Sequence, residues 1–90
     1  MADVEAPLTI LYFAWLRERV GASQESVALP HGVHTVGELI AWLTARDPGH
    51  ASAFANGRAV RCAVNQEFAD PAARIGPGDE IAFFPPVTGG

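Results

Sequence analysis

The chain has 90 residues, a length that fits one domain with a modest hydrophobic core and leaves little room for a separate catalytic domain. Its formal net charge is −4, and its six basic residues are scattered arginines with no lysine, which argues against the clustered positive stripe of a nucleic-acid binder. A single cysteine excludes an intrachain disulfide, and the lack of a signal pattern or a bilayer-length apolar stretch predicts a cytoplasmic protein that does not enter a membrane.

The N-terminal third of the chain predicts a β-hairpin. After a polar lead-in at residues 1–7, the apolar run Leu8–Leu16 lacks clean alternation, which indicates a strand covered on both faces. Residues 21–23 (Gly-Ala-Ser) are typical of a turn. The segment Gln24–Leu29 then alternates between polar and apolar residues, which indicates a second strand that ends before Pro30.

A helix is predicted to follow the hairpin. Thr35 and Glu38 fit a capping box, in which each side chain satisfies a free backbone N–H group of the other residue. Apolar residues then recur at helical spacing and form one buried stripe, made of Val36, Leu39, Ile40 and Leu43. Asp47-Pro48 should stop this helix, because the residue before proline is pushed out of helical geometry. Residues 49–60 are rich in alanine and glycine, and we expect a loop there with room for one short helical turn.

The rest of the chain predicts three strands. Arg61–Val64 is a short strand, Asn65-Gln66 is a turn, and a further short strand passes through Phe68. The turn signal at residues 77–79 (Pro-Gly-Asp) leads into the final strand, Glu80–Phe84. The order strand, strand, helix, strand, short strand, strand predicts an α+β domain, with a mixed sheet, one main helix on one face, and the other face partly open.

Three segments carry a resemblance to a known family. They are Tyr12-Phe13-Ala14-Trp15-Leu16-Arg17-Glu18, Ala63-Val64-Asn65-Gln66-Glu67 and Gly78-Asp79-Glu80-Ile81-Ala82-Phe83-Phe84-Pro85-Pro86-Val87-Thr88-Gly89-Gly90. In this order they resemble the small, sulfur-carrying subunit of molybdopterin synthase over nearly the whole chain, and the last block is the most specific. The resemblance implies a ubiquitin-like β-grasp domain over residues 1–84 and an extended C-terminal tail over residues 85–90.

The resemblance also implies a chemistry for the tail. An ATP-dependent activating enzyme, using magnesium, adenylates the terminal glycine, here Gly90, and a sulfur donor converts it to a thiocarboxylate. The tail then enters the large subunit of the synthase, in an expected heterotetramer of two small and two large subunits. Its sulfur passes there to the cyclic pterin precursor of molybdopterin. The chain itself binds no cofactor and no metal in this interpretation, and most catalytic groups are expected in the large subunit.

The composition of the tail suits this chemistry. Gly89-Gly90 lack Cβ atoms and can pass through a narrow channel. Pro85-Pro86 end sheet pairing and project the tail, and the β-branched Val87-Thr88 favour an extended backbone. A Gly-Gly end alone would more often be a frayed terminus, so the preceding block carries the interpretation.

Candidate docking residues come from the strand pattern and from the resemblance. Side chains alternate along a strand, so Phe84 is expected to face away from the helix if Phe83 faces it. Phe13, Phe68 and Phe84 then form a candidate apolar patch on the open face, which the resemblance implies for contacts with the activating enzyme and the large subunit. Arg17 occupies a family position near the partner. Ordinary core packing for the phenylalanines and a solvated strand-end charge for Arg17 stay open as alternatives.

Other reactive side chains receive no functional role. Cys62 lies in an apolar strand, so a buried inert thiol is favoured over a persulfide carrier. Asp79-Glu80 belong to a turn that enters a strand. The histidines lack ligand-like neighbours in the sequence, which predicts no metal site at His31, His34 or His50.

Two other functions remain open at this point. The first is a sulfur carrier of the same fold that serves thiamine or cysteine synthesis. The second is a ubiquitin-like interaction module, or a modifier conjugated to protein lysines.

Overall fold

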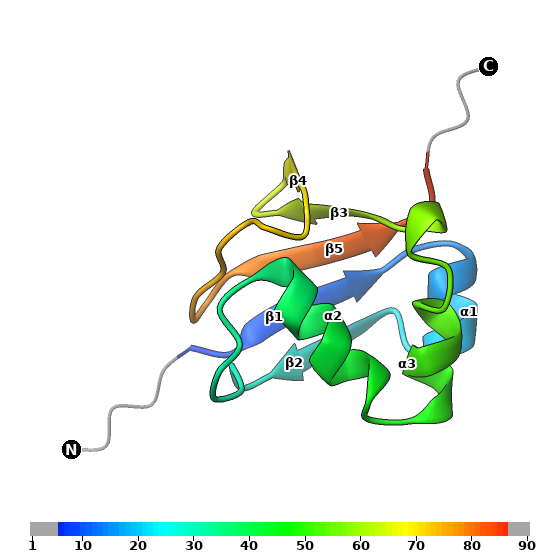
Figure 1. Cartoon of the computed structure of the whole chain (residues 1–90), viewed down its shortest axis with the longest axis horizontal. Coiled ribbons are helices and arrows are strands. Elements are labelled where there is room, and N and C mark those ends of the chain that lie inside the picture. The colour runs from blue at the N-terminus through cyan, green and yellow to red at the C-terminus, as the bar shows by residue number, and fades with distance from the viewer. Residues whose placement is uncertain (1–5, 87–90) are drawn as a thin grey trace.

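The computed structural model describes residues 6–86 and shows a five-stranded sheet with helices over one of its faces (Figure 1). The strands are β1 (Leu8–Tyr12), β2 (Gln24–Val27), β3 (Arg61–Val64), β4 (Glu67–Ala69) and β5 (Glu80–Phe84). The helices are α1 (Trp15–Val20), α2 (Val36–Thr44), α3 (Pro48–Ala53) and the 3-10 turn η1 (Gly57–Ala59). None of the helices in this part of the chain is long and apolar enough to cross a bilayer.

The strand order is β2-β1-β5-β3-β4, and only the central pair, β1 and β5, is parallel. The predicted mixed sheet of an α+β domain is therefore confirmed. Tyr12 of β1 lies opposite Phe83 of β5. Because these two strands run side by side in the same direction, the segment after β5 leaves the sheet beside the segment that enters α1 (Figure 1).

Helix α2 is the main helix, and its start matches the prediction. The Thr35 hydroxyl accepts a hydrogen bond from the Glu38 backbone N–H at 3.2 Å, and the Glu38 carboxylate accepts one from the Thr35 N–H at 3.2 Å. Of the predicted stripe, Ile40 is only half-buried, whereas three residues are fully buried: Val36, Leu39 and Leu43. This stripe packs onto one face of the sheet.

The predicted strand Leu8–Leu16 is wrong beyond Tyr12. The backbone at Ala14 takes φ 54° and ψ −133°, which turns the chain out of the sheet and into α1. Leu16 on this helix is fully buried, and Gly21, at φ 89°, ends it in a left-handed conformation. Strands β1 and β2 do pair antiparallel as predicted, but a helix connects them.

The prediction of a loop at residues 49–60 is also too simple, because α3 and η1 lie there. Asp47 accepts a hydrogen bond from the His50 N–H at 2.9 Å, and Pro48 occupies the first turn of α3. Helix α2 itself ends at Thr44, before this pair. Asp47-Pro48 therefore begins a second helix, and the structure has three α-helices within residues 6–86.

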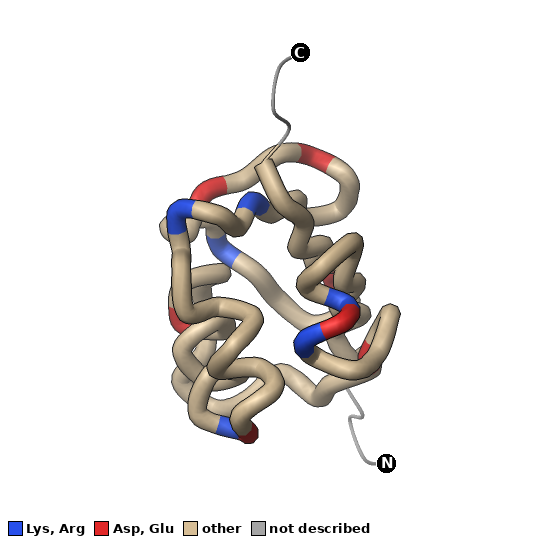
Figure 2. Tube along the Cα trace, turned by 90° about the vertical axis from the view of Figure 1, so that its right-hand side faces the viewer, with Lys and Arg blue, Asp and Glu red and all other residues tan. Residues whose placement is uncertain are grey.

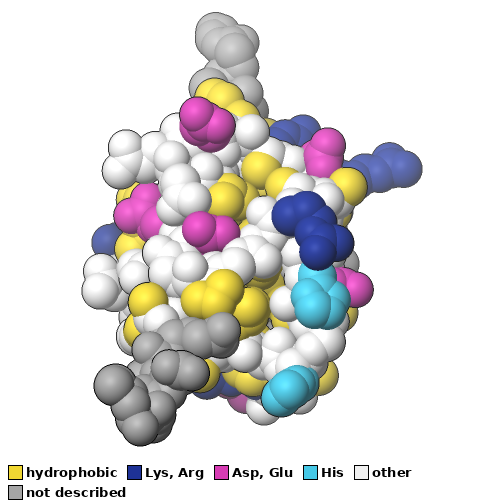
Figure 3. Space-filling view, turned by 90° about the vertical axis from the view of Figure 1, so that its left-hand side faces the viewer, with side chains coloured by type: hydrophobic (Ala, Val, Ile, Leu, Met, Phe, Trp, Pro, Cys, Tyr) yellow, Lys and Arg dark blue, Asp and Glu magenta, His cyan; other side chains and the backbone are white. Residues whose placement is uncertain are grey.

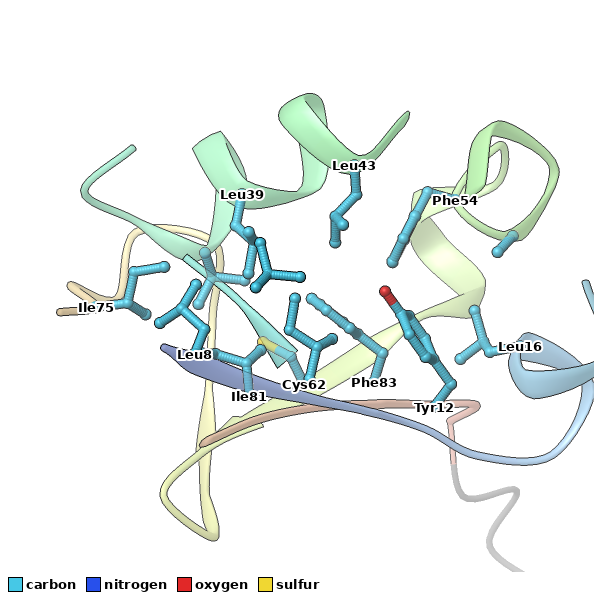
Figure 4. Packing of buried hydrophobic residues seen from close by; sticks show 14 of the residues in the cluster. Leu8, Tyr12, Leu16, Leu39, Leu43, Phe54, Cys62, Ile75, Ile81 and Phe83 are labelled. Atoms are coloured by element: carbon cyan, nitrogen blue, oxygen red, sulfur yellow. The ribbon is translucent and has the colours of Figure 1, made fainter. Parts of the chain in front are cut away.

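The core lies between the sheet and the helices (Figure 4). The ring of Phe83 stacks on Tyr12, with centroids 6.1 Å apart, and meets the edge of Phe54 at 4.9 Å. Leu39 and Leu43 of α2 point into the same layer (Figure 4). Because alternate residues of β1 and β5 face this core, the remaining residues of these strands face the other side of the sheet.

Candidate functional site

The face of the sheet opposite α2, called the open face below, presents the side chains that the core does not use. Directly paired residues of neighbouring strands share a face, so the strand register defines this set. Its members are Gln24 and Ser26 of β2, Thr9 and Leu11 of β1, Glu80, Ala82 and Phe84 of β5, Arg61 and Ala63 of β3, and Phe68 of β4. The centre of the open face is apolar and its ends are polar.

The structure brings two of the three candidate phenylalanines together on this face. Phe68 is 85% exposed, Phe84 is half-buried, and their ring centroids lie 5.9 Å apart. Phe13 is 48% exposed, and its backbone N–H donates to the carbonyl of Phe83 at 3.1 Å. Phe13 therefore lies at the end of β5, next to the pair. Exposed aromatic side chains of this kind are typical of docking surfaces.

Arg17 lies on α1 and not at a strand end. Its side chain is exposed and forms no ion pair with any residue from 6 to 86. Figure 2 views the molecule from the end where β5 terminates and shows both basic and acidic positions at this end. Arg17 belongs to α1, which starts at Trp15, two residues after Phe13.

The base of the tail follows β5 directly. The strand ends at Phe84, and Pro85 and Pro86 are half-buried residues outside it. The other candidate tail residues lie outside the described residues; they are Val87, Thr88, Gly89 and Gly90.

Two arginines at the corner between η1 and β3 were not predicted. Arg61 lies opposite Phe84 in the register, and its Nη1 donates to the carbonyls of Arg58 at 3.0 Å and Val60 at 3.3 Å. Both Arg58 and Arg61 are exposed. The alternation of side chains within β3 could have predicted the position of Arg61. If Cys62 faces the core, Arg61 must face the open side together with Phe84.

The sulfur of Cys62 does not belong to this site. Cys62 is buried, and its thiol donates to the Ala69 carbonyl at 3.2 Å. Burial, with a smaller contribution from the charge of Asp70, raises the pKa of the Cys62 thiol. The predicted burial of Cys62 is confirmed.

His50 has close partners that the sequence did not reveal. It is buried, and its ring nitrogens lie 2.7 Å from the Glu25 carboxylate and 2.9 Å from that of Asp47. Glu25 also accepts hydrogen bonds from the Tyr12 hydroxyl at 2.8 Å and from Arg46 at 3.0 Å. Within residues 6–86 no group of histidine, cysteine and acidic side chains is arranged to hold a metal ion. The cluster around His50 is a structural tie between elements.

Comparison with known sequences matches nearly the entire chain. Residues 10–90 match the ThiS family. The molybdopterin synthase sulfur carrier subunit of Escherichia coli K12 is 39% identical over 83 residues, which cover 92% of this chain and 99% of that protein. The proteins of the same name from Chlamydomonas reinhardtii and Homo sapiens are 34% and 33% identical, over 92% and 90% of this chain and 98% and 91% of their own.

Solved structures show the same fold. A Pyrococcus furiosus protein, provisionally named molybdopterin converting factor subunit 1, superimposes with a TM-score of 0.74 at 28% identity, covering 91% of this chain and 99% of its own. Small archaeal modifier protein 1 of Haloferax volcanii gives a TM-score of 0.68 at 28% identity, with the same coverage. The ubiquitin-like β-grasp fold expected from the sequence is thereby confirmed.

Proposed function

The chain belongs to the ThiS family, and from this premise we propose that it is the sulfur carrier subunit of a molybdopterin synthase. One observation carries the proposal: relatives with that name are 33% to 39% identical over at least nine-tenths of this chain. The structure supports it because Pro85 and Pro86, at the base of the tail, directly follow the central strand β5, which ends beside the exposed side chain of Phe13.

The proposed working group is the carboxyl of Gly90. An α-carboxylate has a pKa of about 3.5, so it is an anion at neutral pH and a poor electrophile. Its attack on ATP forms an acyl adenylate and releases pyrophosphate. A hydrosulfide ion supplied by the donor then attacks the acyl carbon, displaces AMP and, after loss of its proton, leaves a thiocarboxylate. The activating enzyme supplies ATP, magnesium and the stabilising charges, so the carrier needs no catalytic side chain of its own.

The absence of lysine suits a chain with an activated end. An acyl adenylate reacts readily with amines, and this sequence offers no side-chain amine. Copies of the chain therefore cannot consume one another through lysine acylation while they wait for the sulfur donor.

The proposed acceptor complex contains the large subunit of the synthase, in a heterotetramer. The aromatic patch (Phe13, Phe68 and Phe84) docks on the large subunit and on the activating enzyme, and the tail reaches the reacting centre of each. In the large subunit the thiocarboxylate sulfur passes to the cyclic pterin precursor. A localisation in the cytoplasm, where these partners would be found, is part of the proposal.

The test is reconstitution with the cognate activating enzyme, sulfur donor, large subunit and pterin precursor. Wild-type chain should yield molybdopterin, whereas a chain lacking Gly90 and a chain extended by one alanine beyond it should yield none. All three should show the same circular dichroism and thermal midpoint. Sulfur transfer by the extended chain would contradict the proposed role of Gly90.

A second function has a specific observation in its favour, because one structural relative is named a small archaeal modifier protein. In that case the Gly90 carboxyl would end in isopeptide bonds with lysines of other proteins. Mass spectrometry of cellular adducts separates the two functions. After trypsin, which cuts last at Arg74, a modifier leaves residues 75–90 joined by an isopeptide bond to target lysines, whereas a dedicated carrier leaves none. A carrier for thiamine synthesis would instead bind a thiazole synthase and not the large subunit.

A further inference from the structure

The charges on the open face are separated along strand β5. Glu80 lies at its start, and Arg61 lies opposite Phe84 at its end. The end of the molecule opposite to α1 also presents several acidic side chains (Figure 3). A partner that covers the open face therefore meets the guanidinium of Arg61 at the end of β5 and the carboxylate of Glu80 at its start.

Hydrogen bonds hold the Arg61 guanidinium in one position beside the end of β5. Both of its recorded hydrogen bonds run from Nη1 to the carbonyls of Arg58 and Val60, at 3.0 Å and 3.3 Å. These bonds occupy the two hydrogens of Nη1 and leave the edge formed by Nε and Nη2, which binds a carboxylate through two parallel hydrogen bonds. No acidic side chain between residues 6 and 86 forms an ion pair with this guanidinium.

A hollow beside Arg61 provides room for such a group. Its volume is about 270 Å³, and Arg61, Phe68 and Phe84 line it together with Cys62 and Ala69. Two aromatic rings next to a guanidinium suit a side chain with an apolar stem and a carboxylate head, which describes glutamate and aspartate. The hollow also adjoins the aromatic patch, so it lies within the docking surface proposed above.

We propose that Arg61 binds a carboxylate side chain on the surface of the large subunit, beside the entrance that receives the tail. This inference rests on the proposed function and adds a charged contact to it. The contact fixes the orientation of the carrier, because a docking surface made of aromatic rings alone would tolerate rotation about the tail. Arg58 adds positive charge next to Arg61 and increases the rate of encounter with an acidic rim.

The chain's own terminal carboxylate is the competing occupant. Four residues follow Pro86, which corresponds to a reach of roughly 13 Å when extended. A chain that ends at Pro86 with an amidated C-terminus lacks a terminal carboxylate and separates the two cases. An effect of Arg61 that persists in the truncated chain must come from the partner.

The experiment measures binding to the cognate large subunit by calorimetry, in both the full-length and the truncated chain. Arg61→Glu should raise the Kd at least about tenfold at low salt, Arg61→Ala about threefold, and the difference should shrink at 0.5 M salt as the charges are screened. Arg74→Glu is the matched control, because it makes the same charge change at an exposed residue outside the open face. The backbone of Arg74 forms an isolated antiparallel β-bridge with Thr35. The Kd of this variant should stay within about twofold of wild type.

Equal effects of Arg61→Glu and Arg74→Glu would overturn the inference, and so would an Arg61 effect that disappears in the truncated chain. Arg61 is exposed, and thermal midpoints of the variants check that the fold is retained. Failure of the wild-type chain to bind the large subunit at all would instead overturn the proposed function, and this inference with it.

Discussion

A buried histidine ties helix α3 to strand β2 at the scale of single residues. Both ring nitrogens of His50 face carboxylates, Glu25 at 2.7 Å and Asp47 at 2.9 Å. Glu25 also accepts from the Tyr12 hydroxyl, whose pKa is raised by burial and by this carboxylate, so Tyr12 remains a neutral donor. The side chain of Glu25 is only 16% exposed, and its donors compensate the burial of its charge.

This cluster makes the free energy of unfolding depend on pH in the acid range. Burial alone would raise the pKa of Glu25, but hydrogen bonds from its three donors outweigh burial and lower it. The backbone and ring N–H groups of His50 likewise lower the pKa of Asp47. A carboxylate with a lowered folded pKa stabilises the fold above its unfolded pKa, about 4 for both residues, and this contribution is lost as pH falls through the folded pKa.

We therefore predict that the free energy of unfolding, measured with urea, falls as pH is lowered from about 5 to about 3. Glu25→Gln should lower stability by about 2 kcal/mol at pH 7 and flatten the acid dependence. Glu67→Gln, at an exposed residue of β4, is the control and should leave the profile unchanged. An identical acid dependence in wild type and Glu25→Gln would contradict the account.

Ala14 is a second residue with a predicted effect on stability. Its φ of 54° and ψ of −133° place an alanine in a region that costs non-glycine residues about 1–3 kcal/mol. Ala14→Gly should therefore raise the free energy of unfolding by about 1 kcal/mol, after the entropy of the unfolded glycine is subtracted. The same change at Ala41, exposed within α2, should lower it by about 1 kcal/mol. Equal losses in both variants would refute the strain at Ala14.

At the scale of elements, the sequence predicted what local rules determine and missed what packing determines. The capping box at Thr35 and the apolar spacing after it predicted α2, and turn residues predicted β5. Helices α1 and α3 have six residues each, too few for a clear apolar period. They are stabilised by packing against each other, and Trp15 and Leu16 were therefore mistaken for part of a strand.

The contact between α1 and α3 depends on Gly49. A Cβ at this position would lie 2.7 Å from the backbone carbonyl oxygen of Arg19, so alanine does not fit. Gly49→Ala should lower the free energy of unfolding by about 1–3 kcal/mol, although alanine normally favours a helix. Gly57→Ala, where a Cβ meets nothing within 4 Å, is the control and should be nearly neutral. A neutral Gly49→Ala would show that the two helices are less closely packed.

Substitutions on the two faces of the sheet should have different effects: those on the open face should weaken binding, and those on the core face should lower stability. Phe68 is 85% exposed, so Phe68→Ala should change the free energy of unfolding by less than about 0.5 kcal/mol. It should nevertheless weaken binding to the large subunit by at least about tenfold, as removal of an exposed aromatic anchor does. Phe83→Ala, in the core, should cost about 3–5 kcal/mol of stability. Unchanged binding of Phe68→Ala would remove Phe68 from the docking surface.

At the scale of the whole molecule, the proposed function requires that the folded domain present the C-terminal tail beside a docking surface. The parallel central strands β1 and β5 place the tail base next to Phe13 and α1, and β3 places Arg61 on the other side. The aromatic and tail candidates could be identified from the sequence, because alternation and the C-terminal block are local features. The His50 cluster could not, because residues far apart in the chain create it. The alternation of β3 places Arg61 on the open face, but its neighbours Phe68 and Phe84 come from other strands.

The central claim is that the carboxyl of Gly90 becomes a thiocarboxylate, and intact-mass spectrometry tests it most directly. The protein is incubated with its cognate activating enzyme, ATP, magnesium and a sulfur donor, with the Gly90-deleted chain as control. We predict that the wild-type chain gains the mass difference between sulfur and oxygen, that the gain maps to its last residue, and that the deleted chain gains nothing. An unchanged wild-type mass in a system that activates a known carrier would contradict the account.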